Sequence, residues 1–160
     1  MSMTAPRKLT RVMDGLFARF DYTGLLVLVV EPDPESRAAL VRALVELGLP
    51  QPREAATSAE ALAQAAELEP ALVICDKQLE GPDGTDGLEL LFRIRADSTT
   101  LPPNVPVLLL AGEAGSPGVM EAKRLAVDGF LVKPVPAKRL EARINAVMMR
   151  RFPERVDWGR

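Results

Sequence analysis

The sequence contains short runs of Val, Leu and Ile, and each run is followed by a stretch with helical periodicity. Two of the runs cover residues 25–30 and 71–75. Runs of this length and composition are typical of strands buried on both faces, as in a parallel sheet. Three further short runs, over residues 52–56, 107–110 and 130–132, repeat the pattern. Five parallel strands are therefore predicted.

Helical stretches fill the gaps between these strands and follow the last one. Asp33 and Ser58 are each predicted to cap the first turn of such a stretch, and Asp86 is predicted to begin another. The predicted helices cover residues 34–47, 58–69, 86–96, 117–127 and 136–150. Strict alternation of strands and helices predicts an α/β fold, namely a flavodoxin-like, doubly wound five-stranded parallel sheet in the order 2-1-3-4-5.

An extra amphipathic helix is predicted before the first strand. Such a helix has to bury its apolar face, so it is expected to dock on its own domain, on a second copy or on a partner. The chain is accordingly divided into an N-terminal extension with this helix (1–23), one α/β domain (24–150) and a C-terminal tail (151–160). The apolar residues of this helix recur at helical spacing and are Leu9, Val12, Met13, Leu16, Phe17 and Phe20.

Composition excludes several classes of function. The sequence has no histidine, which removes His-containing zinc sites and Ser-His or Cys-His catalytic pairs. Cys75 is the one cysteine, and no apolar run is long enough to cross a bilayer, so a cytoplasmic protein without a membrane partner is expected. The basic C-terminal residues adjoin no helix-turn-helix pattern, so nucleic acid is not an expected partner. No base–nucleophile pair is visible, so an enzyme is not expected.

Charged residues follow the first, third and fifth predicted strands. Glu31 and Asp33 come after the first strand, Asp76 ends the third, and Lys133 follows the fifth. Because ligands of an open parallel sheet bind outside the carboxyl ends of its strands, these side chains are expected to share one site. Clustered carboxylates usually persist where a cation offsets them, and a lysine can neutralise an oxyanion as a point charge.

This ordered set of residues resembles the receiver domain of two-component response regulators over about residues 25–149. Each element alone is weak, but the order and the Lys-Pro pair after the fifth strand are specific. The matching elements are Val29-Val30-Glu31, Ile74-Cys75-Asp76, Asp86-Gly87-Leu88-Glu89-Leu90-Leu91, Val105-Pro106-Val107 and Phe130-Leu131-Val132-Lys133-Pro134.

The resemblance implies a role for several of these positions. Asp76 matches the aspartate that accepts a phosphoryl group from a histidine kinase or phosphotransfer protein, and Lys133 matches the lysine that contacts that group. Phe130 stands at the position of the switch aromatic. Ala111 occupies the Thr or Ser position after the fourth strand, so no hydroxyl is available there to bind a phosphoryl oxygen.

The same resemblance implies a magnesium site made by Glu31, Asp76 and the backbone carbonyl of Gln78. Pro32 replaces the second acid of the family's pair, so Mg²⁺ is expected to bind weakly or not at all. Asp33 could replace the missing ligand only by leaving its capping position. The loop after Asp76 also appears about three residues longer than is usual in the family, judged from the position of the Asp-Gly-Leu element.

Three functions remain open at this point. The first is a stand-alone receiver-type signalling protein of a phosphorelay, with Asp76 as acceptor and output through protein contacts. The second is a pseudo-receiver that acts as a docking module without phosphorylation. The third, a flavin or nucleotide binder on the same fold, is disfavoured because Pro32 and Pro34 stand where a phosphate-binding loop would need backbone amides.

Charge is distributed unevenly along the chain. Residues 21–100 contain 15 acidic and 6 basic residues, whereas residues 116–160 contain 5 acidic and 10 basic ones. An acidic protein partner, or the acidic part of a second copy in a homodimer, is therefore expected to meet residues 116–150. In the resembling family this region adjoins the switch aromatic and is a common output surface. The alternative is a basic face that is merely solvated.

Overall fold

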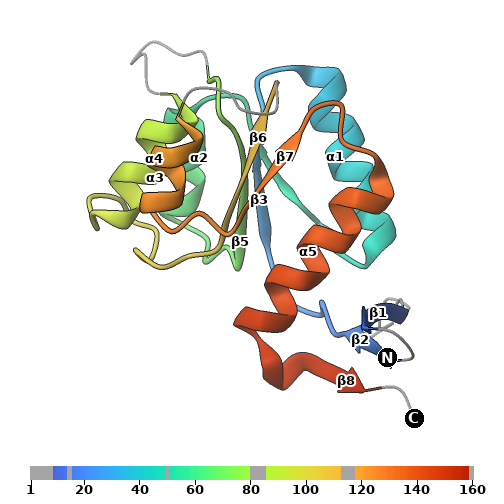
Figure 1. The fold of residues 1–160 in the computed structure, drawn as a ribbon. Coiled ribbons are helices and arrows are strands. Elements are labelled where there is room, and N and C mark those ends of the chain that lie inside the picture. Colours follow the sequence, from blue (N-terminus) through green and yellow to red (C-terminus); the bar gives the residue numbers. More distant parts are fainter. Residues whose placement is uncertain (1–8, 14–15, 50, 80–85, 113–117, 159–160) are drawn as a thin grey trace.

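The computed structural model describes residues 9–13, 16–49, 51–79, 86–112 and 118–158, with side chains from residue 18 onward. A five-stranded sheet forms its centre, and all neighbouring strands in it are parallel. The strand order is β4-β3-β5-β6-β7, which confirms the predicted 2-1-3-4-5 order (Figure 1). The strands are β3 (Val27–Val30), β4 (Arg53–Ala55), β5 (Leu72–Asp76), β6 (Val107–Ala111) and β7 (Gly129–Val132).

Five helices cover the two faces of this sheet in the described residues. Helices α1 and α5 lie on one face, and α2, α3 and α4 lie on the other (Figure 1). Their bounds agree with the prediction to within a few residues, and Pro117 lies outside the described residues. The helices are α1 (Pro34–Leu47), α2 (Ser58–Ala65), α3 (Gly87–Arg95), α4 (Val119–Arg124) and α5 (Ala137–Arg151).

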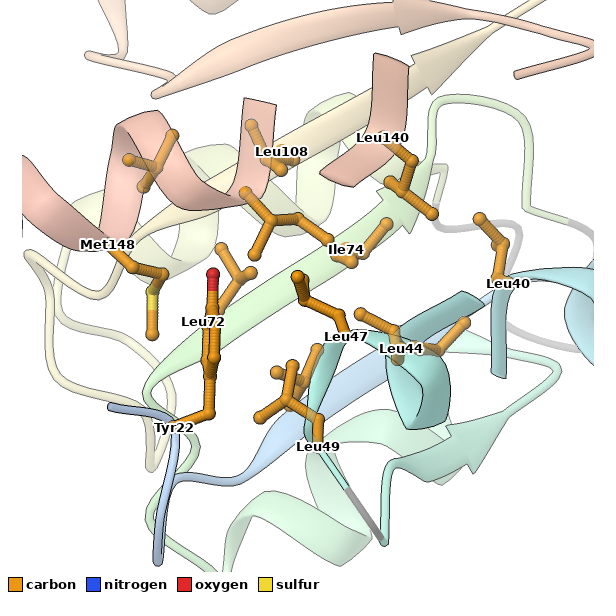
Figure 2. Packing of buried hydrophobic residues seen from close by; sticks show 14 of the residues in the cluster. Tyr22, Leu40, Leu44, Leu47, Leu49, Leu72, Ile74, Leu108, Leu140 and Met148 are labelled. Atoms are coloured by element: carbon orange, nitrogen blue, oxygen red, sulfur yellow. The ribbon is translucent and has the colours of Figure 1, made fainter. Parts of the chain in front are cut away.

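Each central strand sends alternate side chains into two separate apolar layers. Val29 and Ile74 pack with α1 and α5 on one face, whereas Val30 and Cys75 pack with α2, α3 and α4 on the other. Figure 2 shows the first layer, in which leucines of α1 pack with Leu140 and Met148 of α5 over the same face of the sheet. Fully burying one such side chain contributes about 1.5–3 kcal/mol, so the two layers hold the strand ends in place.

Helix ends follow the expected capping chemistry, with one correction. The Asp33 side chain accepts a hydrogen bond from the backbone N–H of Ser36, as predicted, and the Asp86 side chain accepts one from the N–H of Glu89. Thr57, and not Ser58, caps α2, because the Thr57 hydroxyl accepts the N–H of Glu60 at 3.1 Å. Glu60 in turn accepts the N–H of Ala56 at 2.8 Å, an arrangement close to a capping box.

The predicted N-terminal helix is wrong. Residues 9–13 and 16–20 form two antiparallel strands, β1 (Leu9–Met13) and β2 (Leu16–Phe20). A sequence signal for this hairpin was present: Asp14-Gly15 separates two runs, and an Asp-Gly pair between apolar strands is a strong hairpin signal. The pair itself lies outside the described residues, but Ala18 and Phe20 are buried while Arg19 is exposed, which is the alternation of a strand.

The predicted C-terminal tail is also partly wrong. A 3-10 turn, η1 (Pro153–Arg155), follows α5 and leads into strand β8 (Val156–Trp158). Strand β8 pairs antiparallel with β2, so the two ends of the chain build a second sheet in the order β1-β2-β8. This sheet lies beside the last turns of α5, at the amino ends of the central strands (Figure 1).

The small sheet is joined to the central layer by buried contacts. Phe20 and Tyr22 belong to the apolar layer under α1 and α5, and their ring centroids are 4.7 Å apart. The Tyr22 hydroxyl donates to the side chain of Asn145 in α5. Arg155 donates to the backbone carbonyls of Asp21 and Thr23, at 3.2 and 2.8 Å. No described helix is both long and apolar enough to cross a membrane.

Candidate functional site

Of the four charged side chains that the sequence predicted to share a site, three meet at the carboxyl edge of the central sheet, and the fourth, Asp33, caps α1 instead. Glu31 directly follows β3, Asp76 is the last residue of β5, and Lys133 directly follows β7. Because the strands are parallel, their carboxyl ends lie along one edge of the sheet and bring these positions together. The peptide bond between Lys133 and Pro134 is cis.

Lys133 bridges the two carboxylates. Its Nζ lies 2.5 Å from Oε1 of Glu31 and also donates to Oδ2 of Asp76. The Glu31 side chain is 0% exposed and that of Asp76 8% exposed, whereas Lys133 is 27% exposed. The carboxylates are therefore almost fully removed from water, and the ammonium between them supplies much of the charge compensation they need.

Burial shifts the protonation of this group. It raises the pKa of Glu31 to about 7, with a further increase from Asp76 and an opposing effect of Lys133. For Lys133, burial lowers the pKa, but the bonds to Asp76 and Glu31 outweigh burial and the net shift is upward. Oε2 of Glu31 is buried and accepts no hydrogen bond from the described residues. Lys133 thus remains a cation, and Oε2 of Glu31 lacks a hydrogen-bond donor among the described residues.

The loop after β5 orients Asp76. The backbone N–H of Gln78 donates to Oδ1 of Asp76 at 2.8 Å, so each carboxylate oxygen holds one hydrogen bond. Helix α3 begins against the same loop, where the N–H of Gly87 donates to the carbonyl of Lys77 at 2.9 Å. A Cβ on Gly87 would lie 2.1 Å from the Asp76 carbonyl oxygen, so only glycine allows this approach. Residues 80–85, where a longer loop is expected, lie outside the described residues.

Other residues singled out by the sequence lie around the group in separate roles. Asp33 caps α1, with Oδ2 accepting the N–H of Ser36 at 2.9 Å, and this bond lowers its pKa. Ala111 is buried at the end of β6, and its carbonyl accepts the N–H of Lys133 at 2.8 Å. Phe130 is half-buried on β7 and packs against the layer of α2, α3 and α4.

Sequence reasoning missed Arg37. Its Nη1 donates to the backbone carbonyl of Glu31 at 2.8 Å, and its Nε lies 3.3 Å from Oε1 of Glu54. Arg37 therefore braces the backbone that carries Glu31. A single arginine on a helix carries no sequence signal for such a contact, because the contact depends on how α1 lies against β3 and β4.

The donor set suits a hard divalent cation only in part. Glu31 and Asp76 offer carboxylate oxygens, but Pro32 has none and Asp33 is engaged in capping. Among the residues that the structure describes, no three His, Cys, Asp or Glu side chains come together in a way that could hold a metal ion. Ca²⁺ and Mg²⁺ sites need several oxygen ligands, and the Lys133 ammonium already pairs with both carboxylates here and offsets part of their charge.

A cavity of about 580 Å³ opens beside the group, between the first turns of α1 and the start of α5. Asp76 and Lys133 lie in its wall, so a molecule can approach the acceptor position from this side. The other described residues of the wall are Ser36, Ala39, Leu40, Ala43, Gln78, Leu110, Gly112, Pro134, Val135, Ala137 and Leu140.

The sequence is similar to a known protein family and to several characterised proteins. A family model described as "Response regulator receiver domain" matches residues 27–145. The transcriptional regulatory protein AfsQ1 of Streptomyces coelicolor is 31% identical over 131 residues, which are 82% of this chain and 54% of AfsQ1. The chemotaxis protein CheY-3 of Vibrio cholerae is 29% identical over 124 residues, which are 78% of this chain and 92% of CheY-3.

Solved structures show the same fold. The crystal structure of a putative response regulator from Chloroflexus aurantiacus superimposes with a TM-score of 0.69 at 27% identity, and the match covers 78% of this chain and 97% of that one. The chain spans about half the length of the curated transcriptional regulators that it matches. The matched family region leaves out β1, β2 and β8, so the small sheet lies outside it.

Proposed function

The chain belongs to the receiver-domain family of two-component response regulators, and from this premise we propose that it accepts a phosphoryl group on Asp76 in a phosphorelay. The observation that supports this most is the contact of Lys133 with Asp76 at the carboxyl edge of the sheet. A lysine in that place can neutralise the oxygens of an incoming phosphoryl group as a point charge.

The proposed transfer is a displacement at phosphorus. An oxygen of the Asp76 carboxylate attacks the phosphorus of a phosphohistidine on a kinase or phosphotransfer protein. An O–P bond forms, the N–P bond breaks, and its electron pair remains on the leaving imidazole. The Lys133 ammonium, which contacts the Asp76 carboxylate before the reaction, then contacts and neutralises the phosphoryl oxygens. Meanwhile the backbone N–H of Gln78 holds Oδ1 of Asp76 in place. Glu31 keeps Lys133 anchored during this change.

We propose that the protein works as a stand-alone module, as a short chemotaxis-type receiver does. The match covers 92% of CheY-3, and the added strands fold back onto the receiver domain through Tyr22 and Arg155. Output is then contact between proteins. The exposed groove beside β7 supports an acidic partner on residues 116–150, since it holds about 310 Å³ and is lined by Phe130, Arg139 and Arg143 among others.

Receiver domains generally bind Mg²⁺ in this acidic site, and we propose that this one binds it weakly. Pro32 removes one carboxylate, and Lys133 competes for the two that remain. We expect an affinity at least about tenfold below that of an intact site, equivalent to roughly 1.4 kcal/mol. Pro32→Asp should strengthen binding in a Mg²⁺ titration followed by amide chemical shifts. Sub-millimolar binding by the unaltered protein would contradict the proposal.

Intact mass spectrometry after incubation with acetyl phosphate and Mg²⁺ tests the acceptor role. We expect a gain of one phosphoryl group in the unaltered protein and none in Asp76→Asn, which keeps the shape of the side chain but removes the nucleophilic carboxylate. Lys133→Met should slow the reaction strongly. The acceptor role would be rejected if neither acetyl phosphate nor a phosphohistidine donor modified the unaltered protein.

The second candidate is a pseudo-receiver that docks partners without phosphorylation. The ion pairs of Lys133 with Glu31 and Asp76 favour it, because they compensate the acidic group with no phosphoryl group present. Ala111 offers no hydroxyl to a phosphoryl oxygen, so modification should shift the conformation little. Amide shifts around residues 118–133 after beryllofluoride addition separate the candidates: wide changes favour a switching receiver, and local changes favour a docking module.

A further inference from the structure

Helices α3 and α4 carry two large apolar side chains that are exposed to water. Phe92 is 55% exposed and Met120 66% exposed, and among the described side chains these are the two most exposed large apolar ones. The other two of this kind, Val45 and Trp158, lie apart from them on α1 and β8. A single apolar residue on a surface is ordinary, whereas two on helices that pack together indicate a surface that binds another protein.

Both side chains point away from the central sheet. In α3, Leu90 and Ile94 are buried against the sheet, and Phe92 lies two residues from each, about 200° around the helix. In α4, Ala122 is buried, and Met120 lies two residues before it. The two helices are neighbours on the same face of the sheet (Figure 1). Their outer surfaces together therefore present both apolar side chains to solvent.

Charged residues on the same two helices follow a fixed order. Glu89 precedes Arg93 by about one turn of α3, and the two side chains are 3.3 Å apart and 50% and 41% exposed. Glu121 precedes Arg124 on α4, with the side chains 3.7 Å apart. Each helix thus has its acid nearer the amino end and its base nearer the carboxyl end. We call these residues the α3–α4 face: Glu89, Phe92, Arg93, Met120, Glu121 and Arg124.

This order makes the α3–α4 face complementary to itself. When two identical helices pack antiparallel across a two-fold axis, the acid of each copy meets the base of the other. An axis at the level of Leu91 places Glu89 opposite Arg93 of a second copy, and Phe92 within one residue of the axis. Because both helices connect parallel strands of one sheet, they run in the same direction, so α4 can meet its own copy in the same way.

We propose that two copies of this protein associate through the α3–α4 face, with α3 antiparallel to α3 of the second copy. Phe92 and Met120 form the apolar centre, and the pairs between Glu89 and Arg93 set the register. An interface of two short helices from each copy is small, so the dimer is weak and reversible, with a dissociation constant on the order of 10–100 µM. The dimer needs no phosphoryl group and does not rest on the proposed function.

Sedimentation velocity of the full chain at increasing concentration, without metal or phosphodonor, tests the association. We expect Phe92→Glu to weaken the dimer at least about tenfold, because it places a charge at the apolar centre. Val45→Glu is the matched control, since Val45 is 47% exposed on α1, on the other face of the sheet, and it should leave the dimer unchanged. Both substitutions are at exposed positions, and circular dichroism checks that folding is retained. Equal affinity of the two variants would place the interface elsewhere and overturn the proposal.

Charge reversal tests the register. Glu89→Arg gives each copy two bases on α3, and Arg93→Glu gives each copy two acids, so each variant alone should associate at least about tenfold more weakly than the unaltered protein. An equimolar mixture of the two variants restores both pairs across the axis and should associate about as tightly as the unaltered protein. A mixture that associates no more tightly than either variant alone would overturn the antiparallel arrangement.

The outcome is separate from that of the acceptor role. Asp76→Asn removes the acceptor but lies outside the α3–α4 face, so it should dimerise like the unaltered protein. A protein that is never phosphorylated but passes the charge-reversal test keeps this interface. An unaltered protein that stays monomeric up to about 1 mM would overturn the proposal and leave the α3–α4 face for a different partner.

Discussion

At the scale of single residues, the position of Gly87 decides how closely α3 approaches the acceptor loop. We expect Gly87→Ala to destabilise the protein by about 1–3 kcal/mol, because the added Cβ would lie 2.1 Å from the Asp76 carbonyl oxygen, far inside van der Waals contact. Urea unfolding measures this difference. Gly112→Ala is the matched control, since a Cβ there meets nothing within 4 Å. Similar losses in both variants would show that the contact with Asp76 is not the cause.

Tyr22 predicts how stability depends on alkaline pH. Burial, with a smaller contribution from Glu141, raises the pKa of Tyr22 well above its ordinary value. The folded protein therefore holds the neutral phenol, whereas the unfolded chain ionises near pH 10. Stability from this difference is present below about pH 10 and is lost as the pH rises above it.

The variant Tyr22→Phe isolates this contribution. At neutral pH it should cost about 1 kcal/mol through the lost hydrogen bond to Asn145. Above about pH 10 its stability should fall less steeply than that of the unaltered protein. Urea midpoints across pH 8–11 measure both slopes, and identical slopes would contradict the prediction.

At the scale of elements, Asp128 joins three parts of the fold through one buried carboxylate. Its oxygens contact Arg95 of α3 and Arg150 and Arg151 of α5, and Oδ2 accepts the N–H of Val107 at 2.8 Å. The Asp128 side chain is 4% exposed, so the carboxylate is nearly dry. It fixes the amino ends of β6 and β7 against both helix layers.

We expect Asp128→Ala to lower stability by roughly 2–4 kcal/mol, because it leaves Arg95 without its carboxylate and Val107 without an acceptor. Glu121→Ala is the control: Glu121 pairs with Arg124 at 3.7 Å, both side chains are exposed, and such a pair contributes little. Thermal unfolding compares the two. A loss in Glu121→Ala as large as in Asp128→Ala would contradict the buried-pair explanation.

Some features of these elements could be predicted from the sequence, and others could not. The meeting of Glu31, Asp76 and Lys133 was predictable, because parallel strands place their carboxyl ends at one edge whatever the side-chain detail. The cap of α2 was misplaced by one residue, since Thr57 and Ser58 are both good caps and only the backbone decides between them. The cavity was not predictable, because it depends on the gap between α1 and α5 and not on any motif.

At the scale of the whole molecule, the pairing of the two chain ends could not be read from local patterns. Residues 18–20 pair with residues 156–158, and a pairing over that separation leaves no periodic signal in either segment. The apolar residues of the N-terminal segment recur at helical spacing, and the adjacent pairs Val12-Met13 and Leu16-Phe17 interrupt the alternation of a strand, so the prediction followed the helical period and gave no weight to the Asp-Gly pair. The small sheet is thus a feature of tertiary structure.

The small sheet lies at the amino ends of the central strands, and the site lies at their carboxyl ends. Helix α5 starts just after Lys133 and ends beside β8, so it joins the two regions (Figure 1). The α5 residues that face the small sheet, such as Asn145 and Met148, are remote from Lys133 in sequence by several helical turns. The two regions should therefore respond separately to local changes.

Truncation after Phe152 tests this separation. It removes β8, the hydrogen bonds of Arg155 to Asp21 and Thr23, and the pairing partner of β2. We expect a lower melting temperature and faster amide exchange at Ala18 and Phe20, since β2 then keeps only its pairing with β1. Asp76 should keep its amide shift and its reactivity towards acetyl phosphate. Arg155→Ala should show a milder form of the same change, and Lys138→Ala, at the other end of α5, should show none. Loss of Asp76 reactivity in the truncated protein, with folding retained, would show instead that the two edges of the sheet are coupled.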